Sequence, residues 1–122
     1  MWTFDNKTPI YLQIMEQIKI EIITGKLKPG DKILPIRDLA LLTKTNPNTI
    51  QKALFELEEL RLINTQRTNG KFVTDDLGLI SETRENVINN RIKNFIDEMD
   101  VLEVSIKEIE EHLLVKRENK ND

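Results

Sequence analysis

The stretch that decides the fold of this chain is Asn46-Pro47-Asn48-Thr49-Ile50-Gln51-Lys52. Asn46 suits the N-cap of a helix, because its side chain can accept a hydrogen bond from a free backbone N–H of the first turn. Pro47 suits the first helical position, where no backbone donor is needed. The sequence therefore predicts a helix that begins at Pro47.

This predicted helix is amphipathic. Its apolar stripe consists of Ile50, Ala53, Leu54, Leu57 and Leu60. Its first turns expose a different set, Asn48, Thr49, Gln51 and Lys52. Amide side chains pair with adenine edges, a threonine methyl can contact thymine, and lysine reaches guanine or phosphate. The exposed set is therefore either a DNA-reading surface or an ordinary solvated helix end, and its neighbours decide between the two.

Two helices are predicted before it. Thr8-Pro9 is a helix start, and isoleucines recur every fourth residue from Ile10 to Ile22, which predicts a helix over about 9–24. Residues 28–31, Lys-Pro-Gly-Asp, have the composition of a type II turn. A short helix over about 35–42 follows, and a brief connection joins it to Asn46. Two helices joined so closely predict a helix-turn-helix.

A β-hairpin is predicted after this pair. Strand-like residues occupy 62–67 and 72–74, and Asn69-Gly70 between them favours a type I′ turn. Arg67 and Lys71 would then lie at the tip of the hairpin. A helix-turn-helix followed by a basic-tipped hairpin predicts a winged helix, whose wing can contact the DNA backbone or minor groove.

Residues 76–122 are predicted to be helical. One helix should span about 79–99, and Ser105 with Glu108 has the spacing of a capping box that starts a second. The two helices carry more apolar residues than they can bury on each other, which predicts a homodimer. The predicted interface contains Ile80, Val87, Ile88, Ile92, Phe95, Ile96, Met99, Ile106, Ile109 and Leu113.

The predicted fold class is thus mainly α with a small β-hairpin. A winged helix-turn-helix DNA-binding domain would occupy 1–75 and a two-helix dimerisation segment 76–122. The charge follows this division: residues 1–75 hold 11 Lys/Arg and 9 Asp/Glu, whereas residues 76–122 hold 7 and 12. The basic surplus lies in the half predicted to bind nucleic acid.

Several function classes are disfavoured. The chain has no cysteine, so disulfides, thiolate nucleophiles and cysteine metal sites are excluded. It has no membrane-length apolar run, and its first five residues lack the features of an export signal, so we expect a soluble, cytoplasmic protein without a membrane partner. No nucleophile–base pair or phosphate-cradling loop is recognisable, so we expect neither an enzyme nor a cofactor. Glu108 and His112 form only a minimal ligand pair, and we predict no metal site.

With these elements placed, the chain resembles the GntR family of transcription regulators, and within it the YtrA-like subfamily with a short C-terminal part. The resemblance covers about 9–73, through P-I-Y-L-Q-I at 9–14, G-K-L-K-P-G-D-K-I at 25–33, R-D-L-A at 37–40, N-P-N-T-I-Q-K-A-L at 46–54 and L-I-N-T-Q-R at 62–67. It implies a winged-helix domain, a homodimer through the C-terminal helices and binding to an inverted-repeat operator. It also implies DNA contacts from Arg37, the start of the recognition helix and the wing turn.

The chain departs from the family pattern at two places. Leu34-Pro35 stand where the family usually has Pro-Ser, and Thr68 stands where the wing usually has its first glycine. Together, residue chemistry and resemblance assign to DNA binding Arg37, Lys44, Asn46, Asn48, Thr49, Gln51, Lys52, Arg67, Asn69, Gly70 and Lys71. Lys44 and Lys52 are assigned to phosphates rather than bases, because a flexible point charge discriminates poorly.

The sequence therefore predicts a sequence-specific DNA-binding regulator, a repressor that acts as a homodimer on an operator. Two alternatives stay open. The winged helix could bind a protein, or the helical segment could sense a metal or an unidentified small-molecule effector. The segment after residue 75 is too short for a separate ligand domain, so an effector would have to bind between helices or between the two parts of the chain.

Overall fold

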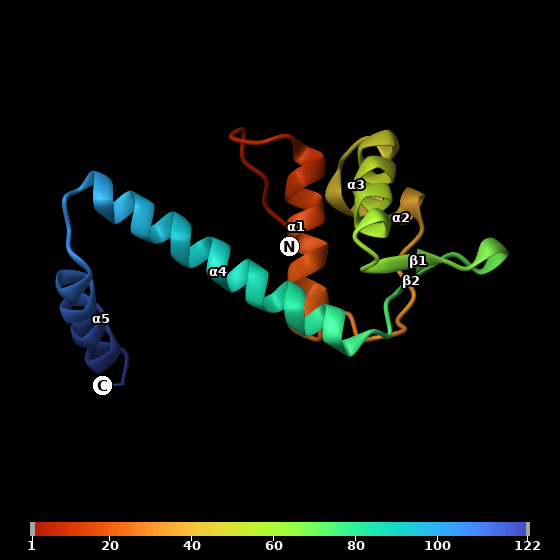
Figure 1. Ribbon diagram of the computed structural model, residues 1–122. Coiled ribbons are helices and arrows are strands. Elements are labelled where there is room, and N and C mark those ends of the chain that lie inside the picture. Colours follow the sequence, from red (N-terminus) through yellow and green to blue (C-terminus); the bar gives the residue numbers. More distant parts are fainter. Residues whose placement is uncertain (1, 122) are drawn as a thin grey trace. The chain divides into compact units, whose positions relative to one another are not determined.

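The computed structural model describes residues 2–121 (Figure 1). Its elements are α1 (Ile10–Ile23), α2 (Ile36–Thr43), α3 (Pro47–Glu59), β1 (Ile63–Thr65), the 3-10 turn η1 (Arg67–Asn69), β2 (Lys71–Val73), α4 (Leu77–Val101) and α5 (Ile106–Asn121). The chain divides into two compact units, and the boundary between them falls after Arg84, within α4. The predicted fold class, mainly α with a small hairpin, is confirmed.

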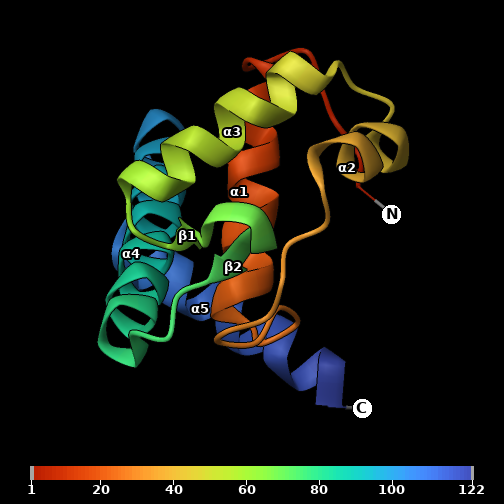
Figure 2. The ribbon, with the colours of Figure 1, turned by 90° about the vertical axis from the view of Figure 1, so that its right-hand side faces the viewer.

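The core of the first unit forms where α1 packs beside α3 (Figure 2). The isoleucines at four-residue intervals on α1 meet the apolar stripe of α3, and the fully buried side chains of the two helices include Ile14, Ile18, Ile50, Leu54 and Leu57. Ile80, assigned from the sequence to a dimer interface, packs partly buried against this core.

The prediction that Leu60 belongs to the buried stripe of α3 is wrong. Leu60 is 47% exposed, because α3 ends at Glu59 and Arg61 takes a left-handed φ of 63°. The chain thereby turns so that the next residue, Leu62, is buried at 1% exposure and donates its N–H to the carbonyl of Leu57 at 3.1 Å.

Local capping sets the start of α3. The Asn46 side chain accepts a hydrogen bond from the N–H of Asn48 at 2.8 Å, so the predicted N-cap is confirmed. Lys44 is the C-cap of the preceding α2, and its left-handed φ of 55° turns the chain toward Asn46. Pro35 is the N-cap residue of α2 and makes no side-chain hydrogen bond to the helix. The helix-turn-helix is therefore formed as predicted.

The wing differs from its prediction. β1 and β2 pair antiparallel, with Ile63 opposite Val73 and Thr65 opposite Lys71. Residues 66–70 form the loop, and positive φ angles occur at Arg67 and Gly70 rather than at Asn69, so the two-residue type I′ turn is wrong.

Burial explains this register. A turn centred on Asn69-Gly70 would place Gln66 opposite Val73, and Ile63 would lose its buried partner. In the observed register Ile63 and Val73 face each other at 2% and 1% exposure. Because a one-residue slip moves every side chain of a strand to the other face, core burial outweighs the local turn preference.

The segment before α2 is attached to β2. Ile33 donates its N–H to the carbonyl of Lys71, and Val73 donates to that of Asp31, both at 2.8 Å. The preceding type II turn is confirmed, with Gly30 at φ 82° and the Asp31 N–H bonded to the Lys28 carbonyl at 3.0 Å. These bonds fix the base of the wing to the helical core.

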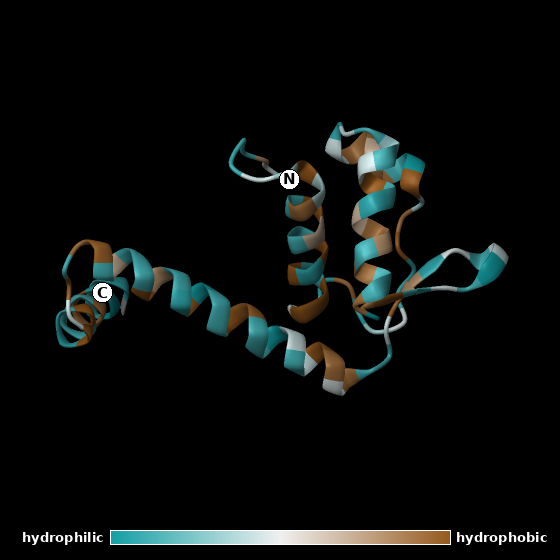
Figure 3. Cartoon of the chain, turned by 45° about the horizontal axis from the view of Figure 1, so that its top comes forward, coloured by the Kyte–Doolittle hydropathy of each residue, from teal (hydrophilic) through white to brown (hydrophobic). Residues whose placement is uncertain are grey.

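In the second unit, α4 continues to Val101 and α5 begins as predicted. The Ser105 hydroxyl accepts a hydrogen bond from the N–H of Glu108 at 3.1 Å, which confirms the cap. Figure 3 shows apolar residues recurring along α4 between polar ones, and Ile109 of α5 is largely buried. None of the described helices contains a stretch long and apolar enough to cross a membrane.

Leu57→Ala tests the packing of α3. Leu57 is fully buried, so its truncation should lower the free energy of unfolding by about 2–5 kcal/mol. The matched variant Leu60→Ala should lower it by less than about 1 kcal/mol. Urea unfolding followed by the fluorescence of Trp2, which packs against the same core, measures both. Equal losses for the two variants would contradict this assignment of the buried face.

Candidate nucleic-acid interface

The outer face of α3 carries the predicted reading residues. Asn48, Gln51, Lys52 and Phe55 are exposed and line one groove of about 450 Å³. Positions i, i+3, i+4 and i+7 share a helix face, so the buried stripe of α3 turns these side chains outward together. Thr49 is only half exposed and does not line the groove.

Phe55 was missed by the sequence analysis. It is 56% exposed, which is unusual for an aromatic side chain and occurs on the face that holds the predicted base contacts. Its position seven residues after Asn48 was the signal that could have found it. An aromatic ring here offers apolar contact to thymine methyl groups beside the hydrogen-bonding amides.

Lys52 is held by a neighbouring helix. Its ammonium lies 4.2 Å from the centroid of the Tyr11 ring on α1. Tyr11 is half-buried against the core. A cation over an aromatic face is stabilised by about 0.5–1 kcal/mol at exposed sites. Tyr11 therefore restricts the Lys52 side chain to the edge of the groove.

Two further predicted cations are exposed on the helix-turn-helix. Arg37 lies in the first turn of α2, and within residues 2–121 its guanidinium makes no ion pair with Asp31 or Asp38. Lys44 lies exposed in the turn between α2 and α3. Both side chains can reach an anionic partner without first breaking an internal contact.

The wing loop presents Arg67, Thr68 and Asn69 to solvent. Gly70 has a φ of 101°, and an added Cβ would lie 3.1 Å from the Cε of Lys32. A larger residue at Gly70 would therefore be strained by backbone conformation and by crowding. The exposed tip holds Arg67 and Asn69 as predicted residues of the wing.

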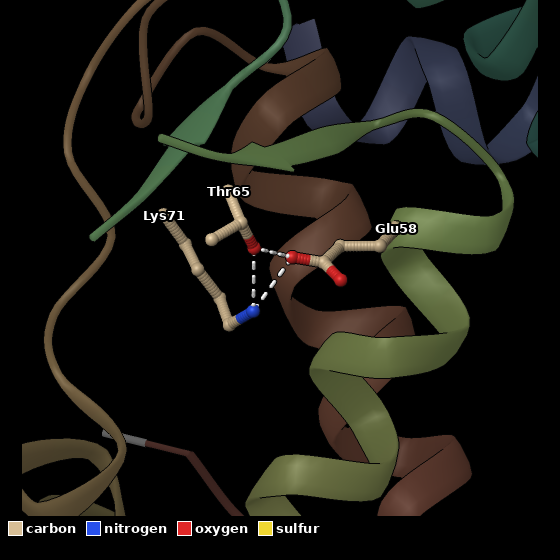
Figure 4. Close-up of polar contacts among 3 residues, drawn as sticks. All are labelled: Glu58, Thr65 and Lys71. Carbon is tan, nitrogen blue, oxygen red and sulfur yellow. Dashed lines mark hydrogen bonds and ion pairs between the residues drawn. The ribbon is translucent and has the colours of Figure 1, made fainter. Parts of the chain in front are cut away.

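Lys71 does not lie at the tip, and its predicted place there is wrong. It is the first residue of β2, and its ammonium donates hydrogen bonds to Glu58 Oε1 at 2.6 Å and to Thr65 Oγ1 at 2.8 Å (Figure 4). The Thr65 hydroxyl also donates to Glu58 Oε1. The side chains of Lys71 and Glu58 are only 25% and 26% exposed.

The charge state of Glu58 follows from these contacts. Partial burial acts to raise the pKa of the Glu58 carboxyl. The hydrogen bonds from Lys71 and Thr65 and the positive charge of Lys71 outweigh this effect, so the pKa lies below its ordinary value. Glu58 is therefore an ionised acceptor at the edge of the groove.

The residues predicted for a dimer interface lie on both units. In the second unit, Phe95, Met99, Ile109 and Leu113 border one apolar hollow of about 200 Å³, together with His112. Ile92 and Ile106 are exposed at 52% and 61%. Val87, Ile88 and Ile96 are half-buried. His112 thus lines an apolar hollow, and in the part of the chain that the structure describes no three His, Cys, Asp or Glu side chains could hold a metal ion.

Comparison with known proteins identifies the family. The family model described as "Bacterial regulatory proteins, gntR family" matches residues 10–73. The chain is 33% identical to the HTH-type transcriptional repressor YtrA of Bacillus subtilis, over 96% of this chain and 95% of that protein.

The chain belongs to the GntR family.

Two solved structures of this kind are similar to the chain. A GntR family transcriptional regulator from Listeria monocytogenes is 40% identical, with a TM-score of 0.85 over 93% of this chain and 98% of that one. The DNA-binding domain of AraR, solved in complex with operator ORX1, is 28% identical, with a TM-score of 0.56 over 59% and 93%. This GntR-family chain is a transcriptional regulator with a DNA-binding domain, not an enzyme.

Acid should remove the stabilisation that ionised Glu58 supplies. A carboxyl whose pKa is lowered by folding stabilises the folded state fully above its unfolded pKa of about 4.3, and this contribution disappears as the pH falls through the folded pKa. Wild type should be more stable than Glu58→Gln at pH 7, by less than about 1 kcal/mol for a pair this exposed.

The difference should shrink as the pH falls through the lowered pKa of Glu58 and vanish once the carboxyl is protonated in the folded state. Urea unfolding of both proteins between pH 7 and pH 3 measures it. Lys71→Met is the control, because it removes the partner that lowers the pKa. A gap between wild type and Glu58→Gln that stays constant over this range would contradict the assignment.

Proposed function

We propose that this GntR-family regulator binds operator DNA in a sequence-specific manner, through α3 and the wing, and represses transcription as a homodimer. The observation that carries the proposal is the outer face of α3, where Asn48 and Gln51 are exposed side by side, one helical turn apart, and free to meet base edges. The AraR domain, whose structure was solved with an operator, supports the same use of this fold here.

The residues divide by chemistry. Asn48, Thr49 and Gln51 contact base edges, because amides pair with adenine and a threonine methyl can contact thymine. Cations and the cap contact phosphates and set the register of the protein on the duplex. The full set of proposed DNA contacts is Arg37, Lys44, Asn46, Asn48, Thr49, Gln51 and Lys52 in the helix-turn-helix, with Arg67, Asn69 and Gly70 in the wing.

A homodimer accounts for the apolar residues of the second half. Ile92, Phe95 and Leu113 are exposed at 52%, 41% and 57%, and such residues are stabilised by a partner surface. A symmetric pair would place two recognition helices in successive major grooves about 34 Å apart, as an inverted repeat requires. Residues 1–75 would then bind DNA and residues 76–122 would join the subunits.

Repression is inferred from a relative, and the location of the protein in the cell is inferred from its proposed binding to operators. The relative YtrA is named a transcriptional repressor, which supports repression rather than activation. A protein that binds chromosomal operators acts in the cytoplasm of a bacterium. The hollow beside His112 is about 200 Å³, below the roughly 300–1,000 Å³ typical of small-molecule sites, so the geometry gives little support to an effector there.

Gln51→Ala tests base reading. It should weaken binding to a selected operator by about 1–3 kcal/mol and relax the preference at one base pair, because one amide pairing is lost. Operators are first selected from a random DNA pool, and binding is then measured by fluorescence anisotropy at two salt concentrations.

The matched variant Lys44→Ala should weaken binding to selected and random DNA alike, and should reduce the logarithmic salt slope of the dimer by about 1.8, about 0.9 for the Lys44 of each subunit. Neither variant should alter the oligomeric state. A wild-type protein that binds selected and random DNA equally, or whose binding ignores salt, would refute the proposed function.

Ile92→Glu tests the homodimer. A charge at this half-exposed position of α4 should raise the dimer dissociation constant at least about tenfold, because an unpaired carboxylate would be buried against the partner. Sedimentation equilibrium measures the effect. Val101→Glu is the control, since Val101 is 83% exposed and outside the predicted interface. Dimers of unchanged affinity in Ile92→Glu would exclude this surface.

A further inference from the structure

One carboxylate joins the wing to the recognition helix. Glu58 lies in the last turn of α3, and its Oε1 accepts hydrogen bonds from both strands of the hairpin, from Thr65 and from Lys71 (Figure 4). Thr65 is the last residue of β1 and Lys71 the first of β2. Glu58 therefore holds the hairpin where the loop of residues 66–70 leaves it and returns.

The same contact balances charge inside the groove. Glu58 and Lys71 both line the groove that holds Asn48, Gln51 and Lys52. A lone carboxylate there would repel the phosphates of a bound duplex. The Lys71 ammonium at 2.6 Å neutralises it, and that ammonium is in turn already occupied, by Glu58 and by Thr65. The pair thus adds little net field to the groove.

The contact also affects the orientation of the loop of residues 66–70. Within the loop, Gln66 donates its N–H to the Gly70 carbonyl and Asn69 donates to the Gln66 carbonyl, each at 2.8 Å. These bonds shape the loop but do not connect it to α3. The Glu58 carboxylate links α3 to both loop ends, in addition to the backbone bonds that hold the base of the wing, so it helps to set the orientation of Arg67 and Asn69 relative to the outer face of α3.

We propose that Glu58 is a positioning residue for DNA recognition, which orients the wing against α3 and withholds the Lys71 ammonium from phosphate. This inference rests on the proposed function. It reassigns Lys71, which the sequence analysis placed among the DNA contacts, to the internal support of the wing. Specificity then depends on a residue that does not itself touch DNA.

Salt-dependent binding of the full chain tests this role. The variants are Glu58→Ala, Lys71→Met and the double variant, each titrated with the selected operator and with random DNA. Loss of Glu58 should reduce the ratio of operator to random affinity at least about fivefold. It should also steepen the logarithmic salt slope of the dimer by about 1.8, because the freed Lys71 ammonium of each subunit now contacts a phosphate, at about 0.9 per contact.

Lys71→Met should weaken operator binding and flatten the salt slope, because the unpaired Glu58 carboxylate then repels phosphates. The double variant should keep the wild-type salt slope, because Lys71 neutralises no phosphate in the intact protein and the variant replaces a neutral pair by two neutral side chains. The double variant should bind the operator more tightly than Lys71→Met, because the repulsive charge is gone. Circular dichroism checks that each variant is folded, and Glu58→Gln replaces Glu58→Ala if the latter is not.

Two results would overturn the positioning role. The double variant would have a salt slope about 1.8 shallower than wild type if the Lys71 of each subunit were an ordinary phosphate contact, and Glu58→Ala would then leave the affinity ratio unchanged. Failure of the proposed function is distinguishable, because wild-type protein would in that case show no preference for the selected operator over random DNA.

Discussion

The packing of α3 against α1 is the interaction on which the rest of the first unit depends. Ile14 and Ile18 meet Ile50 and Leu57, and all four are essentially inaccessible to solvent. Each such side chain contributes about 1.5–3 kcal/mol by leaving water. Because a helix repeats every 3.6 residues, burial of one stripe fixes which residues face outward. The same burial therefore stabilises the domain and orients its reading face.

Side chains far apart in sequence then set how this face is used. Tyr11 restrains Lys52 across two helices, and Glu58 restrains Lys71 across a helix and a strand. Both cations were candidates for DNA contact, yet their surroundings differ. Lys52 stays exposed over its ring, whereas Lys71 is enclosed by a carboxylate and a hydroxyl. Equal charges in one groove thus differ in whether the ammonium is free to meet an outside partner.

The second unit differs from the first because it leaves many apolar side chains exposed. The predicted interface residues Ile92 and Ile106 are more than half exposed, while Ile109 is buried beneath its own helices. Two helices offer each other only one contact face, so apolar residues on the remaining faces stay exposed within the single chain. The proposed homodimer would cover them, and its association would then be coupled to the stability of this unit.

The sequence by itself determined which segments are helical and where α3 and α5 begin. Asn46, the Pro29-Gly30 turn and Ser105 act through bonds to residues two or three positions away, so their effects could be read from the chain. It also determined the family, because the motifs that carry it lie in these local segments.

Only the tertiary structure decided the register of the wing, the exposure of Phe55 and the pairing of Lys71. Asn69-Gly70 favoured a tight turn, but the burial of Ile63 opposite Val73 outweighed it. The partner of Lys71 lies thirteen residues earlier, on another element. A pattern of residue types gives the faces of each helix and strand, whereas which faces meet depends on how the whole core packs.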